Sequence, residues 1–119
     1  MAKKKLAVIM DPIAAIAPEK DGTLGMLLEA QSRSYELTYF QQEDLRIING
    51  IAMGSGRNLK VEDNTTSWFS LSEENEIPLS DFDVILMRKD PPFNTEYIYT
   101  TYILDLAESL GVLVINSPQ

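Results

Sequence analysis

The sequence contains no cysteine and no histidine. Without cysteine, the 119 residues can form no disulfide and no thiolate metal site, and they contain no cysteine nucleophile. Without histidine, they supply neither a Ser-His-Asp triad nor a histidine-bound zinc ion. These two absences exclude many hydrolase and zinc-enzyme sites before any motif is considered.

Positive charge and long apolar runs are also scarce. The 119 residues include 10 Lys and Arg and 18 Asp and Glu, which gives a formal net charge of −8. Because nucleic acids and anionic membranes are bound by clustered positive charge, we expect neither as a partner. No apolar run is long enough for a transmembrane helix or a signal peptide, so we expect a cytoplasmic protein.

Four segments predict the strands of a core sheet. Residues 6–10, 84–87 and 112–115 are continuous apolar runs, which are typical of buried parallel strands. Residues 35–40 alternate in polarity and predict a further strand. With 45% hydrophobic and 24% charged residues, the composition supports a single domain over residues 1–119.

Helical periodicity appears between these strands. Leucines at i, i+3 and i+4 predict a helix from residue 21 or 23 to about residue 34. A second helix is predicted from Asn94 to about residue 110, with Gly111 at the position that ends it. The two expected buried stripes are Leu24, Leu27 and Leu28 in the first helix and Tyr99, Ile103, Leu106, Ala107 and Leu110 in the second.

The middle of the chain has a different character. Asn49 and Gly50 separate two strand-like, mostly apolar segments, residues 46–48 and 51–53, and predict a type I′ hairpin turn. Short strands are also expected at residues 57–61 and 68–71, and a solvated acidic turn at residues 72–76. We therefore predict an α/β fold with a Rossmann-like, open and mostly parallel sheet, flanking helices and an antiparallel hairpin insertion.

Charged side chains stand where two of the predicted strands end. Asp11 follows the first strand, and Arg88, Lys89 and Asp90 follow the strand at residues 84–87. In open α/β sheets, ligands bind beyond the carboxyl ends of the strands. If these strands are neighbours, Asp11 is suited to the ammonium of a zwitterionic ligand and Arg88 to its carboxylate. The alternative is a structural ion pair between Arg88 and Asp11.

Other kinds of site have less support. Asn94 and the start of the second helix offer an additional anion site. The glycines at residues 22 and 25 lack the G-x-G-x-x-G spacing, which weakens a dinucleotide-binding interpretation. We find no nucleophile paired with a general base and no metal-ligand spacing, so no catalytic, cofactor-binding or metal-binding residue is predicted.

Six segments resemble the N-terminal domain of bacterial glutathione synthetases, in the same order and along essentially the whole chain. They are residues 8–13, 26–31, 35–37, 83–93, 97–104 and 114–119. The motif Met-Arg-Lys-Asp-Pro-Pro-Phe at residues 87–93 is highly specific, and Met-Asp-Pro-Ile at residues 10–13 is moderately so.

The resemblance implies a pre-ATP-grasp domain of an ATP-grasp ligase. Such an enzyme joins γ-glutamylcysteine to glycine through an acyl phosphate, and uses ATP and Mg²⁺. The resemblance also implies a cytoplasmic homo-oligomer, either a dimer or a tetramer. In that family a separate ATP-grasp domain binds ATP and Mg²⁺, so residues 1–119 alone are expected to bind neither and to be inactive. Asp11, Arg88, Lys89 and Asp90 map to the substrate-facing edge.

A second class of function remains open from the residues alone. It is a non-catalytic α/β module that binds a small anionic or zwitterionic ligand, or another protein. If the domain belongs to the longer enzyme, we expect it to expose apolar surface where the rest of that enzyme docks. The domain alone would then associate with itself.

Overall fold

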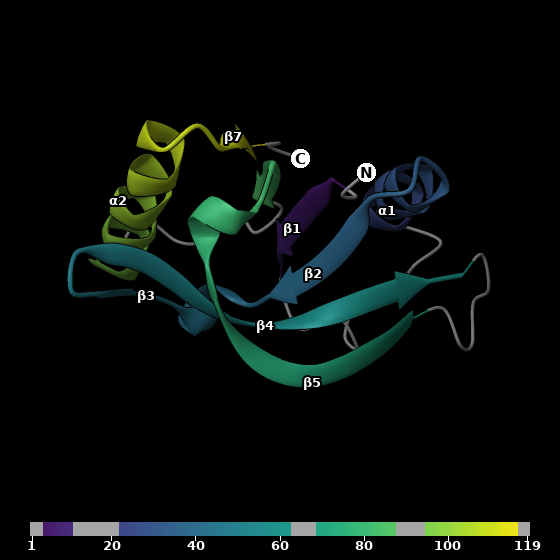
Figure 1. Ribbon diagram of the computed structural model, residues 1–119, viewed down its shortest axis with the longest axis horizontal. Coiled ribbons are helices and arrows are strands. Elements are labelled where there is room, and N and C mark those ends of the chain that lie inside the picture. The colour runs from purple at the N-terminus through teal and green to yellow at the C-terminus, as the bar shows by residue number, and fades with distance from the viewer. Residues whose placement is uncertain (1–3, 11–21, 63–68, 88–94, 117–119) are drawn as a thin grey trace.

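The computed structural model describes residues 4–10, 22–62, 69–87 and 95–116 (Figure 1). They form a seven-stranded mixed sheet with the strand order β3-β4-β2-β1-β6-β7, and β5 pairs with β4 outside this path. The strands are β1 (Lys5–Ile9), β2 (Glu36–Phe40), β3 (Leu45–Ile48), β4 (Ile51–Val61), β5 (Phe69–Pro78), β6 (Val84–Met87) and β7 (Leu113–Asn116). The helices are α1 (Gly22–Ser32) and α2 (Thr95–Ser109), with short 3-10 helices η2 (Gln42–Asp44) and η3 (Leu79–Asp81).

Strands β2, β1, β6 and β7 form the parallel part of the sheet. Ile9 lies opposite Phe40 on one side and Met87 on the other, and Met87 lies opposite Asn116. The four strands therefore end together, at what we call the carboxyl edge (Ile9, Phe40, Met87 and Asn116). Helix α1 connects β1 to β2 and α2 connects β6 to β7, as parallel strands require. The predicted Rossmann-like α/β core is confirmed.

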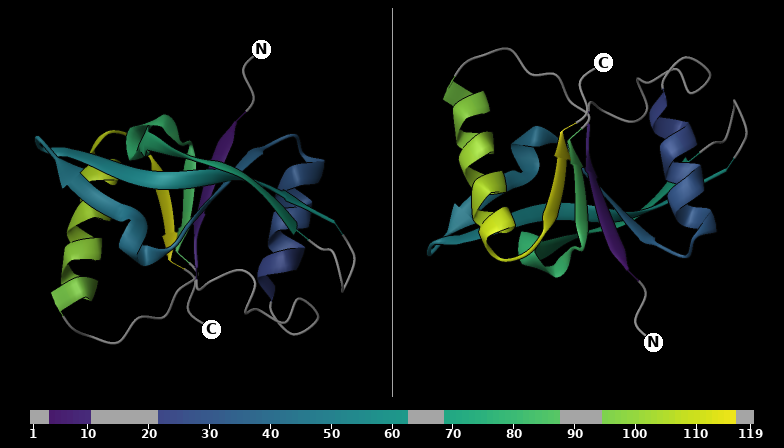
Figure 2. Two further views of the ribbon diagram at one scale, coloured as in Figure 1. Left: turned by 90° about the horizontal axis from the view of Figure 1, so that it is seen from below. Right: turned by 90° about the horizontal axis from the view of Figure 1, so that it is seen from above.

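Each face of the parallel strands carries its own apolar cluster, because successive side chains of a strand point to opposite faces. Ala7 and Ile9 belong to the cluster that includes Ile103 of α2. Leu6 and Val8 belong to the cluster that includes Leu27 of α1. The two helices accordingly lie on opposite sides of the strands (Figure 2).

The antiparallel part differs from the prediction in two respects. The expected strands at residues 51–53 and 57–61 are halves of one strand, β4, which also pairs directly with β2. Residues 72–76, expected as a turn, lie within strand β5. This expectation was wrong because a strand that borders the sheet keeps polar side chains in solvent, and Glu73, Glu74 and Glu76 are exposed.

The predicted hairpin turn and the predicted end of the second helix are confirmed, whereas one helix residue is not where it was expected. Asn49 and Gly50 both have positive φ (53° and 77°), as the type I′ hairpin turn requires. Gly111 has φ 98° and follows the end of α2, as predicted. Leu110, expected in the buried stripe, is 66% exposed because the helix ends at Ser109 and the helical period no longer applies.

The other stripe residues whose side chains the structure describes agree with the prediction. Leu27, Ile103 and Ala107 are buried, and Leu28 and Leu106 are half-buried against the core clusters. The expected stripe residues Leu24 and Tyr99 lie outside the residues whose side chains the structure describes.

Candidate functional site

The carboxyl edge is the part of the fold where the sequence predicts a ligand. Strands β1 and β6 are parallel neighbours, which meets the condition for Asp11 and Arg88 to follow adjacent strands. Directly beyond β1, the Met10 N–H donates to the carbonyl of Phe40 at 3.1 Å, which holds the ends of β1 and β2 together. Neighbouring parallel strands that end at one level form the usual binding edge of an open α/β sheet.

The predicted site residues themselves lie outside the described residues. This applies to Asp11, Arg88, Lys89 and Asp90, and also to Asn94. Their contacts, and the choice between ligand binding and a structural ion pair, therefore remain predictions.

The described part of this edge contains a buried polar link that sequence reasoning missed. Gln42 follows β2, and its Nε2 donates to Thr100 Oγ1 of α2 at 2.9 Å. Both side chains are buried, so the bond also satisfies polar atoms that would otherwise lose contact with water. The link fixes the start of η2 against α2. Gln42 stands two residues beyond the end of β2, and Thr100 stands three residues before Ile103 in the apolar stripe of α2. A polar residue at each of these positions is a separate local signal of burial, although neither shows that the two meet.

A small hollow adjoins this link between α2 and strands β6 and β7. It is lined by Met87, Thr100, Thr101, Leu104, Asp105, Glu108 and Val114. Its volume of about 160 Å³ is less than the roughly 300 Å³ at which ligand pockets begin. The hollow is therefore too small to hold a peptide substrate by itself.

Polar contacts on the antiparallel side fasten the hairpin and the strands around it. The Asp44 carboxylate accepts from the Gln41 N–H at 2.8 Å, and burial raises the pKa of Asp44 above its ordinary value. Arg46 donates to Ser55 Oγ at 2.7 Å and forms an ion pair with Glu76 of β5. The contacts of Arg46 join β3, β4 and β5. Because these polar side chains bind one another, they favour a structural role over ligand binding.

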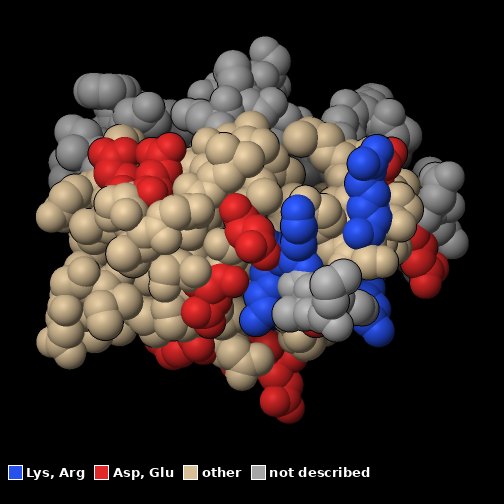
Figure 3. All heavy atoms as spheres, turned by 45° about the horizontal axis from the view of Figure 1, so that its top comes forward, with Lys and Arg blue, Asp and Glu red and all other residues tan. Residues whose placement is uncertain are grey.

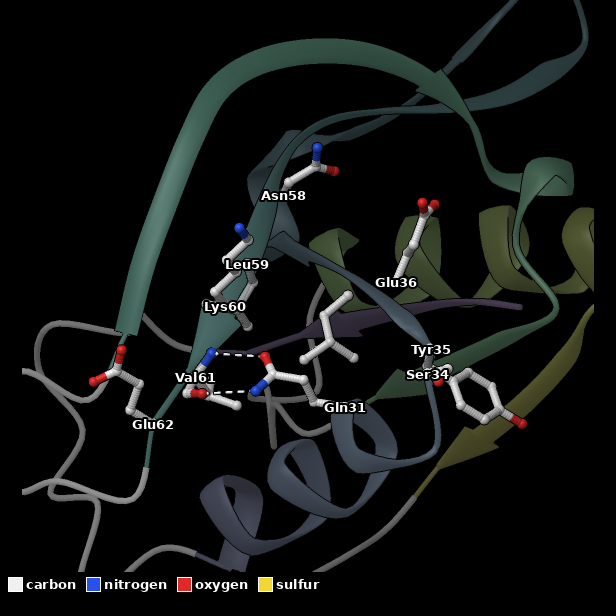
Figure 4. A pocket seen from close by; sticks show the side chains of 10 residues that line it. Gln31, Ser34, Tyr35, Glu36, Asn58, Leu59, Lys60, Val61 and Glu62 are labelled. Atoms are coloured by element: carbon white, nitrogen blue, oxygen red, sulfur yellow. Dashed lines mark hydrogen bonds between the residues drawn. The ribbon is translucent and has the colours of Figure 1, made fainter. Parts of the chain in front are cut away.

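A larger hollow of about 480 Å³ lies at the opposite end of the sheet, between α1 and the end of β4 (Figure 4). In it, Gln31 Nε2 donates to the Val61 carbonyl at 2.8 Å, and the Val61 N–H donates to Gln31 Oε1 at 3.0 Å. These two bonds fix α1 to β4, so the amide of Gln31 is engaged within the fold. The lining of the hollow also includes Glu36 at the amino end of β2, away from the edge where such sheets bind ligands.

Two further properties concern the described part of the chain. No three of its His, Cys, Asp and Glu residues gather closely enough to hold a metal ion. None of its helices is long and apolar enough to cross a membrane.

Comparison with known proteins finds a family match for this chain. Residues 5–119 match the family described as prokaryotic glutathione synthetase, N-terminal domain. The match covers nearly the whole chain, and the chain belongs to this family.

Several relatives carry the name glutathione synthetase. The chain is 53% identical over 115 residues to the protein of Shewanella oneidensis, and 56% identical over 115 residues to those of Escherichia coli and Salmonella typhi. In each case the match covers 97% of this chain and 36% of the relative. The chain thus spans little more than a third of the length of the relatives it matches.

Proposed function

We propose that this chain is the substrate-side N-terminal domain of a glutathione synthetase. The whole enzyme would join γ-glutamylcysteine to glycine, with ATP hydrolysed to ADP and phosphate. The family match over residues 5–119 carries the proposal, and the adjacent ends of the parallel strands β1 and β6 support it.

The four predicted edge residues suit the chemistry of that substrate. The γ-glutamyl end of the dipeptide carries an α-ammonium and an α-carboxylate on one carbon. In our proposal, Asp11 binds the ammonium and Arg88 binds the carboxylate through two parallel hydrogen bonds. Lys89 and Asp90 directly follow Arg88 in the sequence, and in our proposal they hold or brace the substrate.

The described residues contain no preformed metal site. They contain no close group of three acidic or imidazole ligands, and the sequence has no glycine-rich phosphate loop. We therefore assign ATP, Mg²⁺ and the acyl-phosphate chemistry to an ATP-grasp domain in the part of the relatives that this chain does not match. The same proposal includes a cytoplasmic enzyme that forms a dimer or tetramer.

A domain exchange tests the proposal. In a chimera, this chain replaces the matching 115 residues of the Escherichia coli relative. We expect ATP-dependent formation of glutathione from γ-glutamylcysteine and glycine within about tenfold of the parent enzyme, while the 119-residue chain alone turns over no ATP. A chimera that folds but forms no glutathione would refute the proposal and favour a non-catalytic binding module.

A further inference from the structure

One face of the parallel sheet is covered only in part. On the α1 side, Leu6, Val84 and Leu113 form a row across β1, β6 and β7, and Val8, Leu86 and Ile115 form a second row. Leu6, Val8 and Leu86 are buried, whereas Leu113 and Ile115 are 57% and 39% exposed. Helix α1 therefore shields the side chains of β1 and β6 on this face from solvent but leaves those of β7 exposed.

The uncovered part is hollowed and apolar. A hollow of about 680 Å³ lies there, and it is lined by residues of α1, β1, β6 and β7. The charged residues in its lining, Glu29 and Arg33, form an ion pair with each other at 2.6 Å. Figure 3 shows uncharged surface between a group of acidic side chains at the upper left and the basic side chains at the right, which have acidic ones among them. Among the described residues, this face therefore offers apolar contact and little free charge, which does not suit a highly charged partner.

The dimensions of the face suit one helix. Adjacent strands lie about 4.8 Å apart, so β6 and β7 together span roughly 10 Å. That is about the diameter of an α-helix with its side chains. A helix laid over β6 and β7 would stand beside α1 and complete a second layer on this face, as α/β sheets with both faces buried require.

We propose that this face is covered by an amphipathic helix from the region that follows this domain in the relatives. This chain matches 36% of the Escherichia coli relative, and the family describes its part as the N-terminal domain. Strand β7 is the last strand of that part and itself forms the border of the uncovered face. Because α2 covers the opposite face of β6 and β7, chain that continues from β7 finds its free apolar surface on the α1 side.

The test measures how fast a single thiol at this face is alkylated. The chain has no cysteine, so Leu113→Cys introduces one reactive site, and Ile115→Cys provides a second variant on the same face. Tyr102→Cys on α2 is the matched control, because Tyr102 and Leu113 are both 57% exposed. Each variant is made in the 119-residue chain and in the chimera with the Escherichia coli relative, and labelling is read peptide by peptide by mass spectrometry.

We expect alkylation at residues 113 and 115 to be at least tenfold slower in the chimera than in the chain alone, with no change at residue 102. Equal rates at residue 113 in both contexts would overturn the proposal. The proposal would also be overturned if alkylation at residue 102 slowed in the chimera as much as alkylation at residue 113. Concentration-dependent protection already in the chain alone would assign the face to a second copy of the chain, and would also overturn it. The readout does not depend on catalysis, so its failure is separate from failure of the proposed function.

Discussion

Replacing Gly54 by alanine probes the packing that supports the carboxyl edge. Gly54 lies on β4 against the ring of Phe40, and an added Cβ would stand 2.4 Å from Phe40 Cε1. Favourable carbon contacts are about 3.5–4.0 Å, so the ring would have to withdraw by roughly 1 Å. The ring is fully buried and packs edge-on against Phe82, with centroids 5.7 Å apart. It also has Gly56 beside it, where a Cβ would stand 2.8 Å from the ring.

We expect Gly54→Ala to lower the free energy of unfolding by about 2–3 kcal/mol, in the upper part of the range for overpacked cores. The control is Gly25→Ala on α1, where no atom lies within 4 Å of the new Cβ. Alanine is the better helix former, so this variant should gain about 0.5–1 kcal/mol. Urea unfolding followed by circular dichroism measures both values.

A double variant then tests the cause. If the clash with Phe40 is responsible, Phe40→Leu should cost less in the Gly54→Ala background than in the wild type, by more than about 0.5 kcal/mol. A Gly54→Ala variant as stable as the wild type, or costs that simply add, would refute the packing argument.

Two further predictions concern local backbone and charge. Gly111→Ala should lower the free energy of unfolding by about 1 kcal/mol, because Gly111 has φ 98°. Ser34→Gly should raise it by up to about 1 kcal/mol, because Ser34 has φ 68°. Urea unfolding that gives both changes the same sign would contradict this reasoning. Burial raises the pKa of Asp44, so the folded state keeps this proton to higher pH than the unfolded state and loses stability as pH rises above the ordinary value of 3.8. Asp44→Asn should therefore stabilise the protein more at pH 7 than at about pH 3, and urea midpoints that differ equally at both would contradict the sign.

The parallel core was predictable because its signals are local. Continuous apolar runs identify strands that are buried on both faces, and Asn49, Gly50 and Gly111 occupy backbone conformations that few other residues adopt. Each of these features depends on neighbouring residues alone, so the sequence was sufficient to place them.

The antiparallel extension was not predictable in the same way. The acidic residues of β5 favour solvent in any structure, and only the pairing with β4 shows that they belong to a strand. The link between Gln42 and Thr100 joins residues 58 positions apart, so no local pattern contains both. The strands that deliver the candidate site were predicted, whereas the polar bonds that support it depend on tertiary contacts.

In our proposal, the carboxyl edge of β1 and β6 binds the dipeptide through Arg88. The most direct measurement is the KM for γ-glutamylcysteine of the Arg88→Ala chimera, with Arg57→Ala as the control. Arg57 is exposed on β4 and donates to the Ser72 carbonyl at 3.2 Å. Loss of a charged hydrogen-bonded pair costs about 1.5–3 kcal/mol, so Arg88→Ala should raise KM by roughly tenfold or more while Arg57→Ala leaves it unchanged. A KM within twofold of the parent chimera for both variants would contradict the claim.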